Sequence, residues 1–414
     1  MPSPEEVFTP AKPVSTDMFT TRRHERLQER VEEALNEPGR QVVLYGDTGV
    51  GKTSLVMYLA ARRGINMLRV ECGAPFEEMM RDALGRVVGE AEIEKVQRSA
   101  KTAEFGVGLA NFLNLTATKS VGQDIKFAKY PRSVGGLVAE ALGLLGFRVL
   151  FLDNFENIYG KDHSDATARS VAELLKLLSD RGSTQKNEVK AVVAGIPTAA
   201  EALVALDAPT ARRTAQIEVG RMPPDELTQI LDRGGQKLGL QFDPLCSHRI
   251  VFASDGFPYY THLHALHACR VVIEGKRRHV TLEDFESSLD EILNDCDLAL
   301  KKAYSAAVET TGEVRVRKSI LEAVATITHT DVTFKEIRES FLKLHPEYKQ
   351  PEKLNFLSTA IKPLKETYRV LEDSGRPKSK KNLYRFTNPL MRGYVLLRRD
   401  RELRDRHQEP LPIG

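Results

Sequence analysis

The stretch Gly46-Asp47-Thr48-Gly49-Val50-Gly51-Lys52-Thr53 decides how this sequence is interpreted. It matches the pattern G-x-x-x-x-G-K-[ST] at every fixed position. The apolar run QVVLY at 41–45 precedes it and indicates a buried strand, and helical spacing follows from Lys52 to about Arg63. The sequence therefore predicts a phosphate-binding loop from Gly46 to Ser54, placed between a strand and a helix.

Such a loop wraps phosphates with backbone N–H groups, so its side chains must be small. The helix that starts near Lys52 points its positive end at the anion. Lys52 is expected to reach the β- and γ-phosphates, and the Thr53 hydroxyl to coordinate Mg²⁺. We expect ATP with Mg²⁺ as the ligand, held by Gly46, Asp47, Thr48, Gly49, Val50, Gly51, Lys52, Thr53 and Ser54.

The stretch VLFLDNFE at 149–156 supplies the second half of the expected site. An apolar strand that ends in Asp153 delivers a carboxylate that can hold Mg²⁺ directly or through water. Hydrolysis also needs a group that orients or deprotonates a water molecule. Glu156 is the candidate catalytic carboxylate, and Asn154 is the alternative that could hold the water. Slow turnover is expected, because a glutamate does not directly follow the aspartate.

Short apolar runs alternate with helical patterns along the first half of the chain. They predict strands at 41–45, 66–71, 148–152, 189–196 and 216–219. This alternation is typical of an α/β fold in which helices cover both faces of a parallel sheet. Such a sheet binds ligands at the carboxyl ends of its strands. Residues 92–130 fit either a hairpin or an insertion.

The remaining pattern divides the chain into three parts. We expect an α/β P-loop NTPase core over 1–222, a helical lid subdomain over 223–312 and a winged-helix domain over 313–414. The lid pattern is helical throughout. The last part has three helical patterns, at 317–327, 333–344 and 353–371, followed by a basic turn and LYRF. Pro363 is expected to weaken or split the third helix.

Charge is spread unevenly over the 414 residues. The net charge is +3, but residues 312–414 hold 22 Lys+Arg against 14 Asp+Glu, a net of +8. A basic end on an acidic body suggests an anionic partner, with double-stranded DNA as the first candidate. Docking of a protein is the alternative to DNA binding. The candidate DNA contacts are the basic residues of the third helix and the ribbon: Lys353, Lys362, Lys365, Arg369, Arg376, Lys378, Lys380, Lys381 and Arg385.

Other features bear on where the protein works. No stretch approaches the roughly 20 apolar residues of a membrane span. The Pro-rich beginning has no apolar core of a secretory signal. The four cysteines lie far apart and are expected to be buried free thiols in a reducing cytoplasm. His262, His264, His267 and Cys269 crowd one helix, but His262 and His264 point apart, so packing is expected rather than a zinc site.

Together these motifs resemble AAA+/STAND-type P-loop ATPases of the origin-recognition (Orc/Cdc6-like) kind. The resemblance covers nearly the whole chain. It is carried by VFTP at 7–10, MFTTR at 18–22, the loop GDTGVGKTS, the strand VLFLDNFE and the turn Gly256-Phe257-Pro258. A C-terminal winged helix also fits this family.

The resemblance implies further roles for particular residues. Phe19 and Arg22 would line the adenine base, and Thr198 would sense the γ-phosphate from the end of the fourth strand. Arg213, with Arg212, stands where the family places an arginine finger that reaches a neighbouring subunit of a homo-oligomer. The Gly256–Pro258 turn resembles the STAND-type motif that begins a lid helix. The lid sensor arginine of many AAA+ members is missing from 256–267, so sensing through the lid is in doubt.

Three functions remain open at this point. The first is an ATP-dependent switch that engages DNA, and the second is a regulatory NTPase that docks an effector protein in signalling or anti-phage defence. The third is a nucleotide-binding scaffold without turnover.

Overall fold

The computed structural model describes most of the chain. The described residues are 2–23, 25–88, 145–182, 188–206, 208–308, 314–346, 355–373 and 383–406, with positions 135, 138, 139, 142 and 143. They form two compact units. One unit comprises residues 15–47 and 51–220, and the other comprises residues 1–14, 48–50 and 221–414. The expectation for residues 92–130 lies outside the described residues.

A five-stranded parallel sheet forms the centre of the first unit. Its strands are β1 (Gln41–Tyr45), β2 (Met67–Glu71), β3 (Val149–Asp153), β4 (Lys190–Gly195) and β5 (Thr214–Glu218). Their order across the sheet is β2-β3-β4-β1-β5. Because every pair is parallel, all five carboxyl ends lie along one edge. The α/β fold class predicted from the sequence is therefore confirmed, and this edge is where ligands bind in such sheets.

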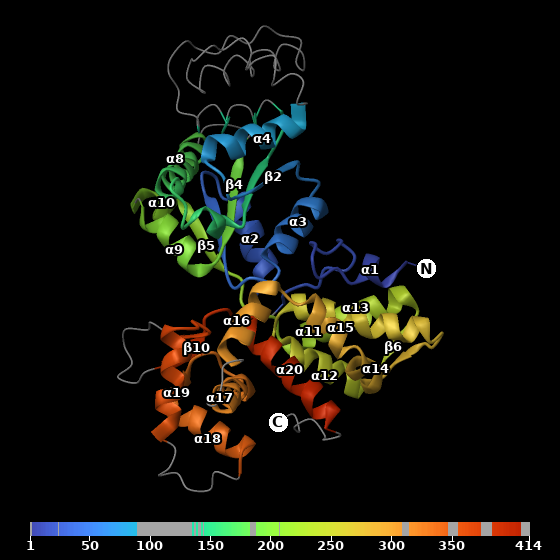
Figure 1. The fold of residues 1–414 in the computed structure, drawn as a ribbon. Helices are drawn as coiled ribbons and strands as arrows, with labels where there is room; N and C mark the ends of the chain where they lie inside the picture. The colour runs from blue at the N-terminus through green and yellow to red at the C-terminus, as the bar shows by residue number, and fades with distance from the viewer. Residues whose placement is uncertain are drawn as a thin grey trace. The chain divides into compact units, whose positions relative to one another are not determined.

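Helices cover both faces of this sheet (Figure 1). The helices α2 (Leu27–Asn36) and α3 (Lys52–Arg62) lie on one face. The opposite face is covered by α4 (Phe76–Val88), α8 (Ser164–Gly182) and α9 (Pro197–Ala205), and α10 (Ala208–Arg213) packs beside α8 and α9. Alternate residues of β1 show the division: Val43 joins the core under α4, α8 and α9, whereas the buried Val42 and Leu44 point the other way.

The second unit begins with α1 (Pro4–Val7) and continues as a group of helices. These are α11 (Pro224–Leu238), α12 (Pro244–Ser254), α13 (Pro258–Glu274), α14 (Leu282–Ser287), α15 (Leu289–Asp295) and α16 (Leu298–Val308). The helical expectation for 223–312 missed one feature, because β6 (Gln241–Phe242) and β7 (His279–Val280) pair in parallel. Two-residue strands show no periodicity by which a sequence could reveal them.

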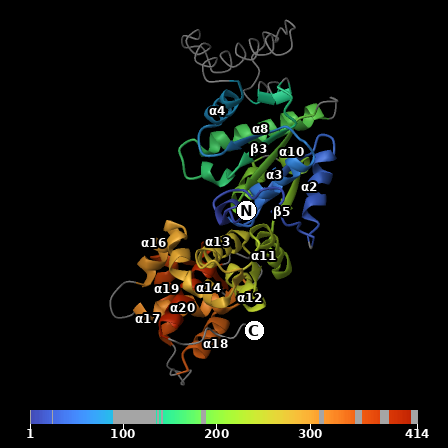
Figure 2. The same ribbon diagram turned by 90° about the vertical axis from the view of Figure 1, so that its right-hand side faces the viewer.

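The remaining elements of this unit are α17 (Val314–Thr326), β8 (Val332–Thr333), α18 (Phe334–Leu344), α19 (Asn355–Glu366), β9 (Leu371–Asp373), β10 (Leu383–Phe386) and α20 (Met391–Asp405). The three strands pair antiparallel in the order β8-β10-β9. Figure 2 shows α20 beside α12 and α14, which it contacts. Its Tyr394 packs edge-on against Tyr304 of α16.

The expectation that Pro363 splits its helix was wrong, because α19 runs through it. The apolar face of α19 is buried, and the helix ends only three residues after the proline. The expected end at residue 371 was also wrong. Arg369 takes a left-handed backbone conformation with φ of 50°, and β9 then begins at Leu371.

A buried ion cluster joins α12 to α20. Asp255, directly after α12, accepts hydrogen bonds from Arg221 at 2.7 Å and from Arg392 of α20. Arg392 also donates to the carbonyl oxygens of Ala325 and Ile327 at 2.8 and 3.1 Å. Burial lowers the pKa of Arg392 to about 10. The cluster therefore ties α12, α17 and α20 together at the Gly256–Pro258 turn. No helix in the described part of the chain is both long and apolar enough to span a membrane.

Candidate nucleotide site

The phosphate-loop sequence lies between β1 and α3, as predicted. Gly49 and Gly51 have φ values of 87° and 94°, a conformation that side chains other than glycine rarely adopt. A Cβ built on Gly51 would meet no atom within 4 Å, so the backbone angle and not space requires glycine there. Helix α3 starts directly after Gly51, and its first backbone N–H groups have no partner within the helix. N–H groups at the start of a helix point toward its amino end, and this arrangement suits an anionic ligand.

Lys52 is held within the loop. Its residue is 7% exposed, and its Nζ donates hydrogen bonds to the carbonyl oxygens of Gly46 at 2.8 Å and Asp47 at 3.0 Å. Burial lowers the pKa of Lys52, and the carboxylates of Glu156, Asp153 and Asp47 oppose that shift. A buried ammonium group with carbonyl partners can exchange them for phosphate oxygens, which are stronger acceptors.

Thr53 and Asp153 meet across the loop. The Thr53 Oγ1 lies 3.0 Å from both carboxylate oxygens of Asp153, and Asp153 is fully buried at the carboxyl end of β3. A hydroxyl and a carboxylate are hard oxygen ligands, and Mg²⁺ commonly takes one or two such protein ligands together with substrate phosphates. The donor set therefore fits Mg²⁺ that arrives with a nucleotide.

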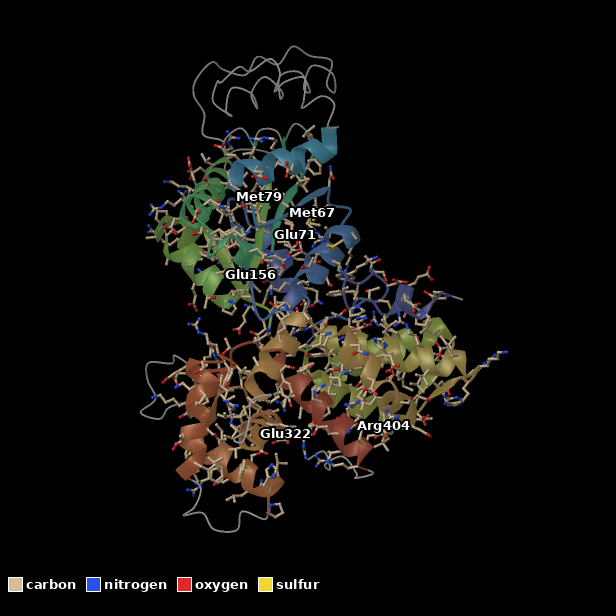
Figure 3. All side chains as sticks on the ribbon, viewed as in Figure 1. Met67, Glu71, Met79, Glu156, Glu322 and Arg404 are labelled. Atoms are coloured by element: carbon tan, nitrogen blue, oxygen red, sulfur yellow. The ribbon has the colours of Figure 1, made fainter. Side chains whose placement is uncertain are left out.

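The two candidates for the hydrolytic group make different contacts. Asn154 has φ of 55°, and its side-chain amide points to Glu71 at 3.5 Å. Glu156 lies in the short helix η1 (Phe155–Ile158), and its Oε2 accepts a hydrogen bond from Ile196 N–H at 3.2 Å. Figure 3 labels Glu71 and Glu156, which mark the end of β2 and the turn after β3. Glu156 thus faces the carboxyl end of β4, whereas Asn154 faces β2.

Gly195 leaves room for the Glu156 carboxylate. A Cβ at this position would lie 3.3 Å from Glu156 Oε2 and 3.3 Å from the Phe155 side chain. Gly195 also accepts a hydrogen bond from Gly46 N–H at 3.2 Å, which joins the start of the phosphate loop to the end of β4. The absence of a side chain at Gly195 therefore helps to bring Glu156 to the same edge as the loop.

Phe19 and Arg22 have contacts within the first unit. Phe19 stacks on Tyr58 of α3 with ring centroids 4.1 Å apart. The buried Arg22 donates to the Gly220 carbonyl at 2.6 Å and contacts Glu25 at 3.5 Å. Arg22 is thus hydrogen-bonded to Gly220, the last residue of the first unit. The ring of Phe19 packs against α3, the helix that follows the phosphate loop.

The two other candidates implied by the family resemblance, Thr198 and Arg213, do not contact Lys52, Thr53, Asp153 or Glu156 through any of the hydrogen bonds or ion pairs described above. Thr198 is exposed in the first turn of α9, directly after β4. Arg213 ends α10, just before the amino end of β5, and pairs with Asp180 of α8 at 2.9 Å. The amino ends of parallel strands lie opposite the edge that carries the phosphate loop. Arg213 therefore belongs to a different edge of its own sheet.

The three histidines of α13 are packed in the second unit. His262 accepts a hydrogen bond from Thr9 N–H at 3.3 Å and lies edge-on to Phe8. His264 stacks on Tyr260, and His267 pairs with Asp295 at 2.9 Å. Over the described ranges, no group of three His, Cys, Asp or Glu side chains could hold a metal by itself. The four cysteines are buried free thiols, and burial raises the pKa of Cys72, Cys246 and Cys296 to about 12.

One residue at the site was missed by the sequence analysis. Arg69 of β2 lies 2.7 Å from Asp153 through Nη2 and 3.0 Å through Nε. A charged residue between the buried Leu68 and Val70 was the available signal. Its partner depends on strand order and register, which place β2 beside β3.

Comparison with known protein families gives a match to the amino-terminal part of the chain. Residues 3–184 match a family model described as an AAA domain. The match covers less than half of the chain, and it includes the phosphate loop, Asp153 and Glu156. It supports an AAA-type P-loop ATPase domain that binds nucleotide. No curated protein matches the chain.

Several solved structures are similar to this chain. The Walker-type ATPase of Pyrococcus abyssi is 17% identical, with a TM-score of 0.47 over 91% of this chain and 96% of that one. The ORC2 protein of Aeropyrum pernix, solved with ADPNP and ADP, is 13% identical, with a TM-score of 0.46 over 92% and 90%. Cdc6p of Pyrobaculum aerophilum is 15% identical, with a TM-score of 0.41 over 97% and 98%.

Proposed function

We propose that this protein is a magnesium-dependent ATP-binding switch that hydrolyses ATP slowly. The observation that carries the proposal is the meeting of three groups at one edge of the sheet. Lys52 lies in the loop, and Thr53 and Asp153 lie 3.0 Å apart. Glu156, which follows β3, is hydrogen-bonded at the carboxyl end of β4. The AAA-domain match over these residues supports it.

The residues have separate roles in this proposal. The N–H groups of 46–54 surround the phosphates, and Lys52 leaves the Gly46 and Asp47 carbonyls to bind the β- and γ-phosphates. Thr53 and Asp153 hold Mg²⁺, which neutralises charge on the phosphate oxygens when bound. Glu156 accepts a proton from the attacking water. Asn154 contacts Glu71 and holds no water in this account.

Two variants test the catalytic assignment. Glu156→Gln keeps the length and the acceptor for Ile196 N–H but cannot take a proton at neutral pH. We expect it to bind a fluorescent ATP analogue normally while turnover falls about 100-fold. Asn154→Ala is the matched control and should keep turnover within about twofold of the unchanged protein. Full turnover in Glu156→Gln would show that another group activates the water.

We propose Arg213 as a residue that acts between chains rather than within one. It would stabilise charge on the transferred phosphoryl group of a neighbouring copy. Its ion pair with Asp180 is partly exposed, so that pair is weak and can be exchanged. Arg213→Ala should lower turnover only under conditions where the protein assembles, which light scattering with and without ATP can establish.

The C-terminal helices and antiparallel strands are proposed to form a winged helix that engages double-stranded DNA. The net charge of +8 over 312–414 supports this partner. Most basic positions of the expected ribbon, and Lys353, lie outside the described residues. DNA binding should weaken steeply as salt rises, because phosphate contacts release counterions. Binding that is insensitive to salt, or absent, would contradict this part of the proposal.

A second candidate function has an observation of its own. Three bases of this region have acidic partners: Lys362 with Glu366 at 3.9 Å, Lys365 with Asp373 at 2.6 Å and Arg385 with Glu372 at 2.7 Å. Neutralised pairs suit protein docking better than phosphate binding. If the full chain binds no duplex DNA at low salt, docking of an effector protein becomes the favoured reading of the C-terminal region.

A further inference from the structure

The carboxylate expected to hold magnesium already has a cationic partner. Asp153 Oδ2 accepts from Arg69 Nη2 at 2.7 Å and from Arg69 Nε at 3.0 Å. Oδ1 accepts from Asn154 N–H at 3.1 Å, and Thr53 Oγ1 lies 3.0 Å from both oxygens. The guanidinium group of Arg69 therefore balances the charge of this buried carboxylate.

Strand register explains why Arg69 reaches this position. Its partner across the β2–β3 pair is Phe151, and the partner of Asp153 is Glu71. Arg69 therefore starts two residues short of Asp153, and its long side chain extends along the sheet to the carboxylate. The Arg69 side chain is 37% exposed, whereas that of Asp153 is 1% exposed. The carboxylate is thus fixed, and the guanidinium group has room to move away from it.

A magnesium ion bound at Asp153 would lie close to this guanidinium group, because Thr53 Oγ1, the other expected ligand, is 3.0 Å from both carboxylate oxygens. Two cations at one carboxylate repel each other. Leaving a buried carboxylate without a counterion is also unfavourable, so we expect the arrival of Mg²⁺ and the withdrawal of Arg69 to be coupled. Incoming triphosphate lowers the cost of this exchange, because it brings negative charge that both cations can contact.

We propose that Arg69 is a positioning residue that neutralises the Asp153 carboxylate until Mg²⁺ arrives with ATP. The inference rests on the proposed magnesium–ATP function of the site. It predicts that Arg69 makes the site reject free Mg²⁺ and raises the magnesium concentration at which ATP binding becomes strong. Arg69 acts through Asp153 and need not contact the reacting atoms.

The test measures magnesium dependence instead of activity. Binding of a fluorescent ATP analogue to the full chain is followed as Mg²⁺ is titrated, for the unchanged protein, Arg69→Gln, Arg69→Lys and Arg62→Gln. Arg62 is an exposed arginine at the end of α3, so its variant is the matched control. We expect the Mg²⁺ midpoint to fall about tenfold in Arg69→Gln, to stay near the original in Arg69→Lys, and not to change in Arg62→Gln.

A second measurement checks the nucleotide-free protein. Free Mg²⁺ should raise the melting temperature of Arg69→Gln but not that of the unchanged protein, because only the variant lacks the guanidinium partner of Asp153. This also shows whether the variant is folded. A midpoint that is unchanged or higher in folded Arg69→Gln overturns the inference while leaving the proposed function intact. Failure of the unchanged protein to bind the analogue at any Mg²⁺ concentration overturns the proposed function instead.

Discussion

Asp153 has three kinds of partner on one buried carboxylate: the Thr53 hydroxyl, the Arg69 guanidinium and the Asn154 amide N–H. Each oxygen of the carboxylate therefore has a hydrogen-bond donor, as buried polar atoms generally do. The same arrangement makes the residue sensitive to a change that preserves its shape. An asparagine would keep the volume and lose the charge that a divalent cation requires.

Asp153→Asn should therefore separate magnesium from nucleotide. We expect ATP affinity at millimolar Mg²⁺ to drop about tenfold, to the level that the unchanged protein shows with a chelator. The amide removes the charged ligand but leaves the loop and Lys52 in place. Parallel ATP titrations with Mg²⁺ and with a chelator measure the difference. Asp162→Asn, at an exposed position, is the control, and full magnesium dependence in Asp153→Asn would remove Asp153 from the metal site.

The sequence singles out candidate site residues that belong to a local pattern. The loop 46–54 and Asp153 are recognised from spacing and neighbours alone. The contacts of Arg69 and Arg22 could not be predicted, since each pairs with a residue more than 80 positions away. Sequence spacing carries no information about which strand lies beside β2. The choice of Glu156 over Asn154 remains a prediction, to which the structure adds their different neighbours.

At the scale of elements, the turn from β1 into α3 depends on backbone angles. Gly51 and Gly64 flank α3, with φ values of 94° and 60°, and a Cβ at either position would meet no atom within 4 Å. Replacing either with alanine should thus cost a similar amount, about 1–2 kcal/mol of stability, from backbone strain alone. Only Gly51 lies in the phosphate loop.

This pair gives a matched test of the loop. Gly51→Ala should lower both the free energy of unfolding and ATP affinity, whereas Gly64→Ala should lower only the free energy of unfolding. Urea unfolding and ATP titration of both variants measure the two quantities. Equal ATP affinity in both variants would mean that the left-handed angle at Gly51 does not shape the phosphate site.

The elements themselves were largely predictable where apolar runs are long. The five strands of the parallel sheet lie within about two residues of their predicted ranges, because each contains buried apolar residues. The errors have local causes. The strands β6 and β7 are too short to show a period, and packing of the apolar face of α19 outweighs the missing N–H of Pro363.

At the scale of the whole molecule, the buried histidines of α13 make stability depend on pH. Burial lowers the pKa of His262 to about 4 and that of His264 to about 3, from an ordinary value near 6.5. Both are neutral in the folded chain, and both gain protons more readily when unfolded. Their contribution is present above pH 6.5 and is lost as pH falls from 6.5 toward 4. By linkage, the loss at pH 5 is about 2 kcal/mol for each histidine.

His264→Phe tests this account, because phenylalanine preserves an aromatic ring against Tyr260 and cannot be protonated. We expect the drop in the free energy of unfolding between pH 7 and pH 5 to shrink by about 2 kcal/mol in the variant. Urea unfolding at the two pH values measures it. An unchanged drop would show that His264 is not neutral and buried in the folded protein.

The charge composition of the C-terminal region does not show which of its basic residues have acidic partners. The net charge of +8 over 312–414 counts charges and not their partners, and several described bases there pair with acids. The sequence could predict a basic region, but not which of its charges remain available to a partner. The pairs Lys365–Asp373 and Arg385–Glu372 depend on the packing of α19 against β9 and on the β9–β10 register, whereas Lys362–Glu366 is a local pair within α19.

The central claim is that the loop 46–54 binds a triphosphate through its amides and Lys52. Isothermal calorimetry of the full chain with ATP at millimolar Mg²⁺ tests it most directly, with Lys52→Ala as the variant and Lys176→Ala, an exposed lysine of α8, as the control. The account predicts ATP binding by the unchanged protein and by Lys176→Ala, and at least a tenfold loss of affinity in Lys52→Ala. No binding of ATP or GTP by the unchanged protein, or undiminished binding by Lys52→Ala, would contradict it.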